Sequence, residues 1–323
     1  MQPPRTTSFS PHVSALPILF ILMWSSGYIG GAVGLHSAGP FTMTFFRFTT
    51  AATLLLLISI ITRAPWPSSW ARAGHIAFVG LFIQAMQFGG LYSGMKAGVP
   101  AGESALIVGM MPILTAIGAG LWLNEKLSWR QWSGLLLGLA GVTLVLWNRL
   151  GHGTARPTAY LLTACALVGI TTGTLYQKKY CAGMDLRTGG FIQLVVGAVV
   201  MYFFASQSEN MAVTWTPSFV GSVAWLAIVN SIGAISLLYI MIGRGEATKV
   251  ASLFYLIPPV TAIMASIMLG ELPTPLAMAG FGVAATGVYL ATKPAAKAER
   301  TPSSGSAQDG VALTAAIPAE GSK

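Results

Sequence analysis

The sequence predicts an all-α polytopic membrane protein with ten transmembrane helices, arranged as two inverted five-helix repeats. Composition is the first reason: of the 323 residues, 54% are hydrophobic and only 8% are charged, and the mean hydropathy is +0.68. A soluble globular chain carries about 25% charged residues, so this chain has too few to cover its surface and must face lipid. The second and third reasons are its long apolar runs and the repetition of their polar residues.

Ten apolar runs are long enough to cross a membrane as helices, since about 20 residues rising 1.5 Å each span a hydrocarbon core of about 30 Å. Within lipid such runs satisfy their own backbone hydrogen bonds as helices. The expected spans are 14–34, 41–62, 75–95, 101–123, 130–148, 158–179, 188–206, 217–242, 247–269 and 274–292.

These spans form two groups of five. We expect one repeat at 14–148 and the other at 158–292, joined by a linker at 149–157. No small-residue cleavage site follows the first apolar run, so residues 1–13 are read as a cytoplasmic segment before a retained first helix. Residues 293–323 are rich in Pro, Ser, Ala and Gly, and we expect a disordered cytoplasmic tail there.

The distribution of basic residues predicts the orientation. The net charge is +9, but no basic face accompanies aromatic stacking positions, which argues against a nucleic-acid partner. With both termini inside, only Lys96, Arg149 and Arg156 of the 18 Lys and Arg residues fall outside, Arg47 falls within a span, and the others fall inside. The positive-inside rule therefore predicts cytoplasmic N- and C-termini.

A shift of 146 residues places the second half of the chain on the first without a gap. Chance similarity between apolar segments would match Ala and Leu, but it would not readily match polar residues within the membrane. Because each half has five spans, an odd number, the halves insert in opposite orientations, as in many secondary transporters with a midplane substrate site. The matched pairs include Ser25 with Thr171, Arg47 with Gln193, Gln84 with Asn230, Pro112 with Pro258, Glu125 with Glu271 and Gly141 with Gly287.

Several motifs occur in an order typical of one family. They are WSS at 24–26 in the first span, FRF at 46–48 in the second, and a proline followed by a terminal glutamate in the fourth and ninth. The stretch LNEKLSWRQWSGLLLGLAGV contains the first of these glutamates, and LGELPTPLAMAGFGVAATGV, which contains the second, repeats it more loosely. Over residues 14–292, the chain resembles the EamA-type branch of the drug/metabolite transporter superfamily.

That resemblance implies a helical bundle around a central cavity, and export of amino acids or related metabolites across a bacterial inner (plasma) membrane. The second half departs from the pattern, with Thr171 and Thr172 in place of the WSS motif and Gln193 in place of Arg47. The family's members differ widely in substrate, so the substrate itself does not carry over.

Polar residues inside the spans are the candidates for a substrate site. A charge within the bilayer is costly, so Arg47 is either a structural residue that caps carbonyls or a site for an anionic group such as a carboxylate. Gln84 and Gln87 share a helix face, and Asn230 occupies the matching place in the second half. These amides either join helices or form a two-sided polar lining, which the pairing across the repeat favours.

Ser25 of the WSS motif and several aromatic residues complete the expected lining. Trp and Tyr near span ends are more often anchors at the membrane interface. Trp24 and Tyr255 lie nearer the middle of their spans and are the better candidates, with Tyr28 and Tyr176 as further ones.

Prolines and glutamates at matched positions are candidates for gating or structural roles. Pro112 and the pair Pro258 and Pro259 are expected to interrupt their helices, where free backbone groups could face a cavity. Glu125 and Glu271 lie at helix ends, where a carboxylate opposes the helix dipole. We expect each to bond to the N-terminus of the next helix across the short turn.

The sequence favours a transporter over other classes. An enzyme would need a constellation of His, Cys, Asp or Glu at depth, and the sequence has none, nor metal-ligand spacing or a cofactor motif. With no mid-span carboxylate for a proton relay, we expect alternating access without tight proton coupling. A lipid or carrier flippase, multidrug efflux on the same fold and a non-transporting sensor are the alternatives. The expected partners are a small metabolite and the bilayer; the oligomeric state is open.

Overall fold

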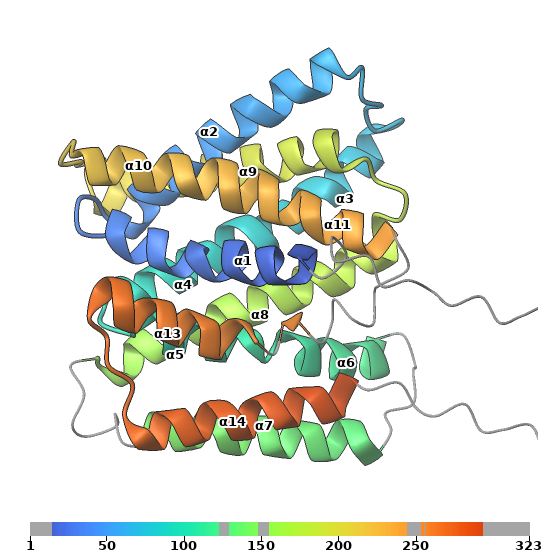
Figure 1. Cartoon of the computed structure of the whole chain (residues 1–323). Helices are drawn as coiled ribbons and strands as arrows, with labels where there is room; N and C mark the ends of the chain where they lie inside the picture. The colour runs from blue at the N-terminus through green and yellow to red at the C-terminus, as the bar shows by residue number, and fades with distance from the viewer. Residues whose placement is uncertain (1–14, 123–128, 148–154, 244–252, 255, 293–323) are drawn as a thin grey trace, which may run out of the picture. The chain divides into compact units, whose positions relative to one another are not determined.

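Helices provide all the regular secondary structure in the described part of the chain (Figure 1). The computed structural model describes residues 15–122, 129–147, 155–243, 253–254 and 256–292, which belong to one compact unit, Met1–Lys293. Within these ranges there is no strand, only an isolated antiparallel bridge between Ala38 and Val213. The all-α prediction is therefore confirmed for the described residues.

The first half contains eight helical segments. In chain order they are α1 (Ala15–Gly34), α2 (Pro40–Ile61), α3 (Trp70–Gly80), η2 (Leu81–Met86), α4 (Gln87–Lys96), α5 (Ala101–Gly109), α6 (Met111–Trp122) and α7 (Trp129–Trp147). The second half contributes α8 (Pro157–Tyr180), α9 (Leu186–Ser208), α10 (Pro217–Trp225), η3 (Leu226–Ala234), α11 (Ile235–Gly243), α13 (Ile257–Leu269) and α14 (Pro275–Thr292).

Within the described residues, seven helices are long and apolar enough to cross a membrane: Ala15–Gly34, Pro40–Ile61, Trp70–Lys96, Ala101–Trp122, Pro157–Tyr180, Leu186–Ser208 and Pro217–Leu238. Three shorter apolar helices, Trp132–Val145, Ile257–Leu269 and Pro275–Leu290, fall where the fifth, ninth and tenth spans are expected. The tail expected at 293–323, most of the linker and Glu125 lie outside the described residues.

Two of the long helices contain a π-helical segment that the apolar pattern did not predict. The segment η2 separates α3 from α4 and carries Gln84, while η3 separates α10 from α11 and carries Asn230. A π-helical turn accommodates an extra residue within an α-helix, and such turns often occur at functional sites. The 146-residue offset that pairs Gln84 with Asn230 therefore also pairs the two irregular segments.

The helix around Pro112 is interrupted, as the sequence suggested. The segment α5 ends at Gly109, Met110 forms a turn, and α6 begins at Met111. A proline lacks the backbone N–H that would continue the hydrogen-bond ladder, and its ring clashes with the preceding turn. In the second half, Pro258 and Pro259 lie in the first turn of α13, where a helix needs no such donors.

The helices of one half pack mainly against those of the other. Among the closest pairs, α2 packs on α9, α7 on α14, α4 on α8 and α5 on α13, while α1 packs on α13, α10 and η3. Figure 1 shows α7 and α14 side by side. Gly141 of α7 allows this approach, because a Cβ there would lie 2.5 Å from the backbone nitrogen of Ala284 in α14.

Two carboxylates cap helices that are distant in the sequence. Glu209, directly after α9, accepts hydrogen bonds from the backbone nitrogens of Phe41 at 3.0 Å and Thr42 at 2.7 Å, in the first turn of α2. Glu271 accepts one from Ala101 at 2.9 Å, at the start of α5. Glu271 thus caps a helix of the other half, a contact that the sequence did not predict.

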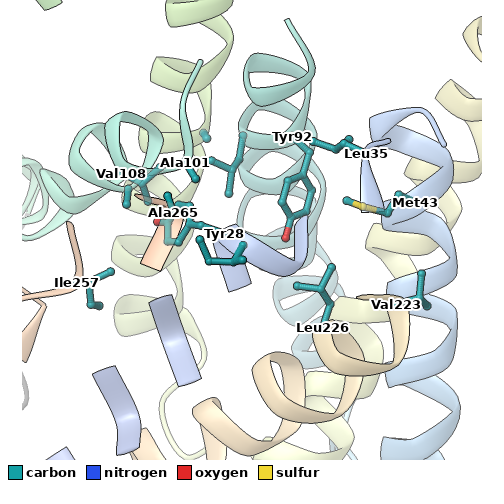
Figure 2. Packing of buried hydrophobic residues seen from close by; sticks show 14 of the residues in the cluster. Tyr28, Leu35, Met43, Tyr92, Ala101, Val108, Val223, Leu226, Ile257 and Ala265 are labelled. Atoms are coloured by element: carbon teal, nitrogen blue, oxygen red, sulfur yellow. The ribbon is translucent and has the colours of Figure 1, made fainter. Parts of the chain in front are cut away.

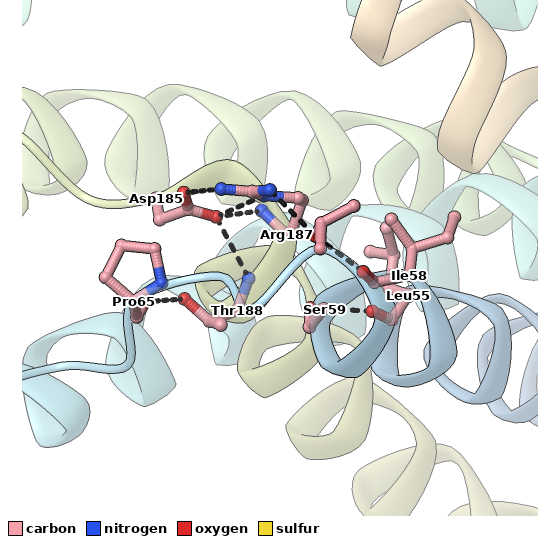
Figure 3. A network of polar contacts seen from close by, with 8 residues as sticks. Leu55, Ile58, Ser59, Pro65, Asp185, Arg187 and Thr188 are labelled. Atoms are coloured by element: carbon pink, nitrogen blue, oxygen red, sulfur yellow. Dashed lines mark hydrogen bonds and ion pairs between the residues drawn. The ribbon is translucent and has the colours of Figure 1, made fainter.

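A polar network joins the end of α2 to the start of α9 (Figure 3). Asp185 caps α9 by accepting from the backbone nitrogen of Arg187 at 2.9 Å, and it pairs with the Arg187 guanidinium at 2.7 Å. Arg187 also donates to Thr62 Oγ1 at 2.8 Å, and Thr188 Oγ1 donates to the Pro65 carbonyl at 2.8 Å. Together with Glu209, this network fixes both ends of the α2–α9 pair.

This network is expected to make stability depend on pH. Hydrogen bonds from the Arg187 side chain, aided by backbone N–H groups, hold the pKa of Asp185 below its usual range. A carboxylate whose folded pKa is lowered stabilises the fold above its unfolded pKa, about 3.9, and that contribution is lost as pH falls through the folded pKa. Asp185→Asn keeps a capping side chain without the charge. Melting curves should therefore separate wild type from Asp185→Asn above about pH 4 and converge below it; a constant separation from pH 3 to 7 would contradict this assignment.

Candidate substrate cavity

A small cavity lined by aromatic, aliphatic and polar residues lies between the two halves, within the central cluster of buried residues. Figure 2 shows part of that cluster, which includes Tyr28 of α1 and Tyr92 of α4. The cavity has a volume of about 60 Å³, enough for a few water molecules but not for a metabolite. Its walls come from α1, α2, α4, η3 and α11, and are formed by Trp24, Gly27, Tyr28, Arg47, Gln87, Phe88, Leu91, Tyr92, Asn230 and Ile235.

Arg47 is the charged residue in this lining, and it is only 4% exposed. Its Nη1 donates to the hydroxyl of Tyr92 at 2.7 Å, and its Nε donates to Ser231 Oγ of η3 at 3.2 Å. The guanidinium carbon also lies 4.2 Å from the ring centroid of Phe88. All three partners are electrically neutral.

Among the described residues, no carboxylate lies within 4.0 Å of the Arg47 guanidinium. A buried cation is costly unless it is paired, and arginine carries five N–H donors in a fork that matches a carboxylate. The hydroxyls of Tyr92 and Ser231 hold the side chain in place without neutralising it. The geometry therefore leaves a preorganised positive charge at the wall of the cavity.

Asn230 fixes the wall between α1 and η3. Its Nδ2 donates to the carbonyl of Met23 at 2.6 Å and lies 3.5 Å from that of Trp24. A Cβ on Gly27 would lie 2.6 Å from the same Nδ2, so only glycine allows this approach without a shift. Nearby, the last residue of α10, Trp225, donates from its indole Nε1 to Ser26 Oγ of α1 at 2.9 Å.

The structure brings together five of the residues expected to line a substrate site: Trp24, Tyr28, Arg47, Gln87 and Asn230 line the cavity. Tyr255 lies outside the described residues. Ser25 is buried but is not among the lining residues; its Oγ donates to the carbonyl of Ile257 at 3.4 Å, which joins α1 to α13.

Two expected residues lie elsewhere. Gln84 packs against α9. A Cβ added to Gly197 of α9 would lie 2.7 Å from the Cβ of Gln84. Tyr176 lies near the end of α8, where its hydroxyl pairs with His75 Nδ1 at 2.8 Å and its ring centroid is 4.4 Å from that of Phe78. Neither residue is among those that line this cavity, because the rotation of each helix about its axis, which the sequence does not give, turns each side chain toward other neighbours.

The sequence reasoning missed Tyr92, Phe88 and Leu91. A signal was present: Leu91 follows Gln87 by four residues and Tyr92 follows Phe88 by four, the spacing that puts side chains on one helix face. Extending the face of Gln87 along α4 would have identified Leu91, whereas Phe88 and Tyr92 form the neighbouring row of the same helix.

A bundle of long apolar helices with a small cavity between its two halves fits a membrane transporter. The chain belongs to the EamA-like transporter family: the family model matches residues 14–147 and again residues 157–293. The family was thus correctly predicted from the motifs.

Named relatives cover most of the chain. The uncharacterized transporter YvbV of Bacillus subtilis is 28% identical over 282 residues, covering 86% of this chain and 90% of the relative. A probable amino-acid metabolite efflux pump of Escherichia coli K12 is 25% identical, covering 85% and 93%. A probable terminal-alkyne amino-acid exporter of Streptantibioticus cattleyicolor is 26% identical, covering 84% and 91%. A solved crystal structure with 20% identity shares the fold, with a TM-score of 0.62 over 87% of this chain and 96% of that one.

Proposed function

We propose that this protein exports amino acids or closely related carboxylate metabolites across a bacterial inner membrane by alternating access. The observation that carries the proposal is Arg47: a buried cation whose partners among the described residues are all neutral, at the wall of a cavity to which both halves contribute. A substrate carboxylate would supply the missing counter-charge. The relatives named as an efflux pump and an exporter of amino acids agree with this substrate class and with outward transport.

The proposed architecture is ten spans in two inverted repeats, 14–148 and 158–292, with a linker at 149–157 and both termini, including the tail at 293–323, in the cytoplasm. Three observations support it: the double match of one family model, the 146-residue offset between polar residues, and the two π-helical segments at matched positions. The orientation rests on the distribution of basic residues.

Alternating access requires the cavity to open, because about 60 Å³ does not admit a metabolite. The irregular segments are the places where the helices can bend most easily, since π-helical turns and proline breaks interrupt the α-helical ladder. Two of them, η2 and η3, border cavity-lining residues, and the Met110 break divides α5 from α6. We assign hinge roles to these segments, with Pro112 and Pro258 as the fixed breaks and Pro259 beside them.

The described lining of the cavity contains no carboxylate and no histidine. A proton relay through the cavity therefore has no titratable carrier among these residues. We propose facilitated diffusion or weakly coupled exchange, in which the metabolite gradient supplies the driving force.

Reconstitution into proteoliposomes tests the proposal. A panel of amino acids, carboxylates without an amine, nucleosides and sugars is offered to protein-containing and empty liposomes. We expect saturable flux of at least one carboxylate compound, and a rate that an imposed pH gradient leaves unchanged. Flux no greater than that of empty liposomes for every carboxylate would overturn the proposed function.

A further inference from the structure

Two buried amide oxygens at the cavity have no hydrogen-bond partner. Among the described residues, eight buried side-chain oxygens are unpaired; six are hydroxyls of Ser or Thr, and the other two are Gln87 Oε1 and Asn230 Oδ1. A hydroxyl can rotate and donate, whereas an amide oxygen can only accept. Both amide residues line the cavity and none of the six hydroxyl residues does.

The orientation of the Asn230 amide follows from its contacts. Its Nδ2 faces the carbonyls of Met23 and Trp24, and exchanging the two ends of the amide would place an oxygen against those acceptors. The free Oδ1 is therefore an unsatisfied acceptor, a group that is costly to leave buried. Elsewhere in the described residues, a buried amide of this kind is paired: Gln193 Nε2 donates to Gln177 Oε1 at 3.1 Å.

The two acceptors come from different halves of the chain. Gln87 is the first residue of α4, directly after η2, while Asn230 lies within η3. The residues that line the cavity thus include one cation, Arg47, and two unpaired amide oxygens, Gln87 Oε1 and Asn230 Oδ1. They also include the aromatic rings of Trp24, Tyr28, Phe88 and Tyr92. An ammonium group has three donors and no acceptor, and aromatic faces also attract cations.

We infer that Gln87 and Asn230 accept hydrogen bonds from the ammonium group of the transported molecule, so that the site selects zwitterions over simple carboxylic acids. This inference rests on the proposed function, in which Arg47 holds the carboxylate. An amino acid would contact Arg47 through its carboxylate, and Gln87 and Asn230, one from each half of the chain, through its ammonium group. A carboxylate without the amine leaves the two amide oxygens unpaired.

The test compares an amino acid with its deaminated carboxylate in proteoliposomes. For wild type, we expect the amino acid to be transported at least about tenfold better in kcat/KM, since a site that hydrogen-bonds a donor discriminates against the analogue lacking it. Gln87→Met keeps the length of the side chain but removes the acceptor, and should reduce that ratio about tenfold. Gln193→Met removes an amide outside the cavity and should leave the ratio unchanged.

The outcomes separate the two proposals. Equal transport of both compounds by wild type, or an unchanged ratio in Gln87→Met, overturns the selection by amides while leaving carboxylate transport intact. No transport of either compound defeats the proposed function itself. The wild-type comparison needs no variant, so it remains decisive if Gln87→Met does not fold.

Discussion

Replacing Arg47 by alanine is expected to lower the kcat/KM for carboxylate substrates by roughly 30- to 700-fold. Removing one member of a buried, hydrogen-bonded charge pair costs about 2–4 kcal/mol, and the pair here is Arg47 with the substrate carboxylate. The effect should appear in proteoliposome flux, and uptake of a neutral substrate, if the panel identifies one, should change little.

Folding of the Arg47→Ala protein should be close to normal, because the side chain is a buried cation without a carboxylate partner among the described residues. The matched variant is Arg47→Lys, which keeps the charge but cannot reach Tyr92 and Ser231 in the same fork geometry. It should retain part of the activity. Undiminished carboxylate transport by a well-folded Arg47→Ala protein would contradict the anion-binding role.

Gly287→Ala is expected to cause the largest loss of stability from a single added methyl group. A Cβ at this position of α14 would lie 2.4 Å from the backbone nitrogen of Gly138 and 2.6 Å from the carbonyl oxygen of Gly134, both in α7. Backbone atoms cannot rotate away, so the two helices must separate. Overpacking of this kind costs about 1–3 kcal/mol, which a thermal-stability assay of the purified protein would detect.

Gly282→Ala is the matched control on the same helix. No heavy atom lies within 4 Å of a Cβ at that position, and alanine is the better helix former. Its stability should equal or exceed that of wild type. If both variants melt together with wild type, then the close α7–α14 contact does not support the fold as described.

The sequence predicted the positions of the helices well, because apolar run length is set by the thickness of the bilayer and each span is bounded by polar or turn-forming residues. The expected span 14–34 corresponds to Ala15–Gly34, and 188–206 lies within Leu186–Ser208. The π-helical segments could not be predicted in this way. One extra residue barely alters the length or the composition of an apolar run.

The sequence identified some of the residues that line the cavity and not others, and the reason differs from residue to residue. Arg47 could be identified because a charge at depth is rare and costly, and Gln87 and Asn230 because amides within spans are uncommon. The sequence could not show that Tyr176 and Gln84 lie away from this cavity, because helix rotation is set by packing, such as the contact of Tyr176 with His75. Tyr92 was missed because a tyrosine in an apolar run resembles an interface anchor until its hydroxyl is found on Arg47.

The capping glutamate illustrates the same limit. A carboxylate at a helix end has to find a free N–H group, and the sequence favoured the next helix because it is closest along the chain. The structure shows Glu271 bonded to Ala101, 170 positions away. Contacts between the two halves decide such partners, and those contacts are not visible in a single sequence.

Equilibrium binding to the purified protein tests the central claim most directly. The best transported amino acid is compared with its carboxamide, which has the same shape and amine but no carboxylate charge. If Arg47 holds the carboxylate, wild type should bind the amino acid at least about tenfold more tightly than the carboxamide, and Arg47→Ala should bind the two alike. Equal binding of both compounds by wild type would contradict the claim.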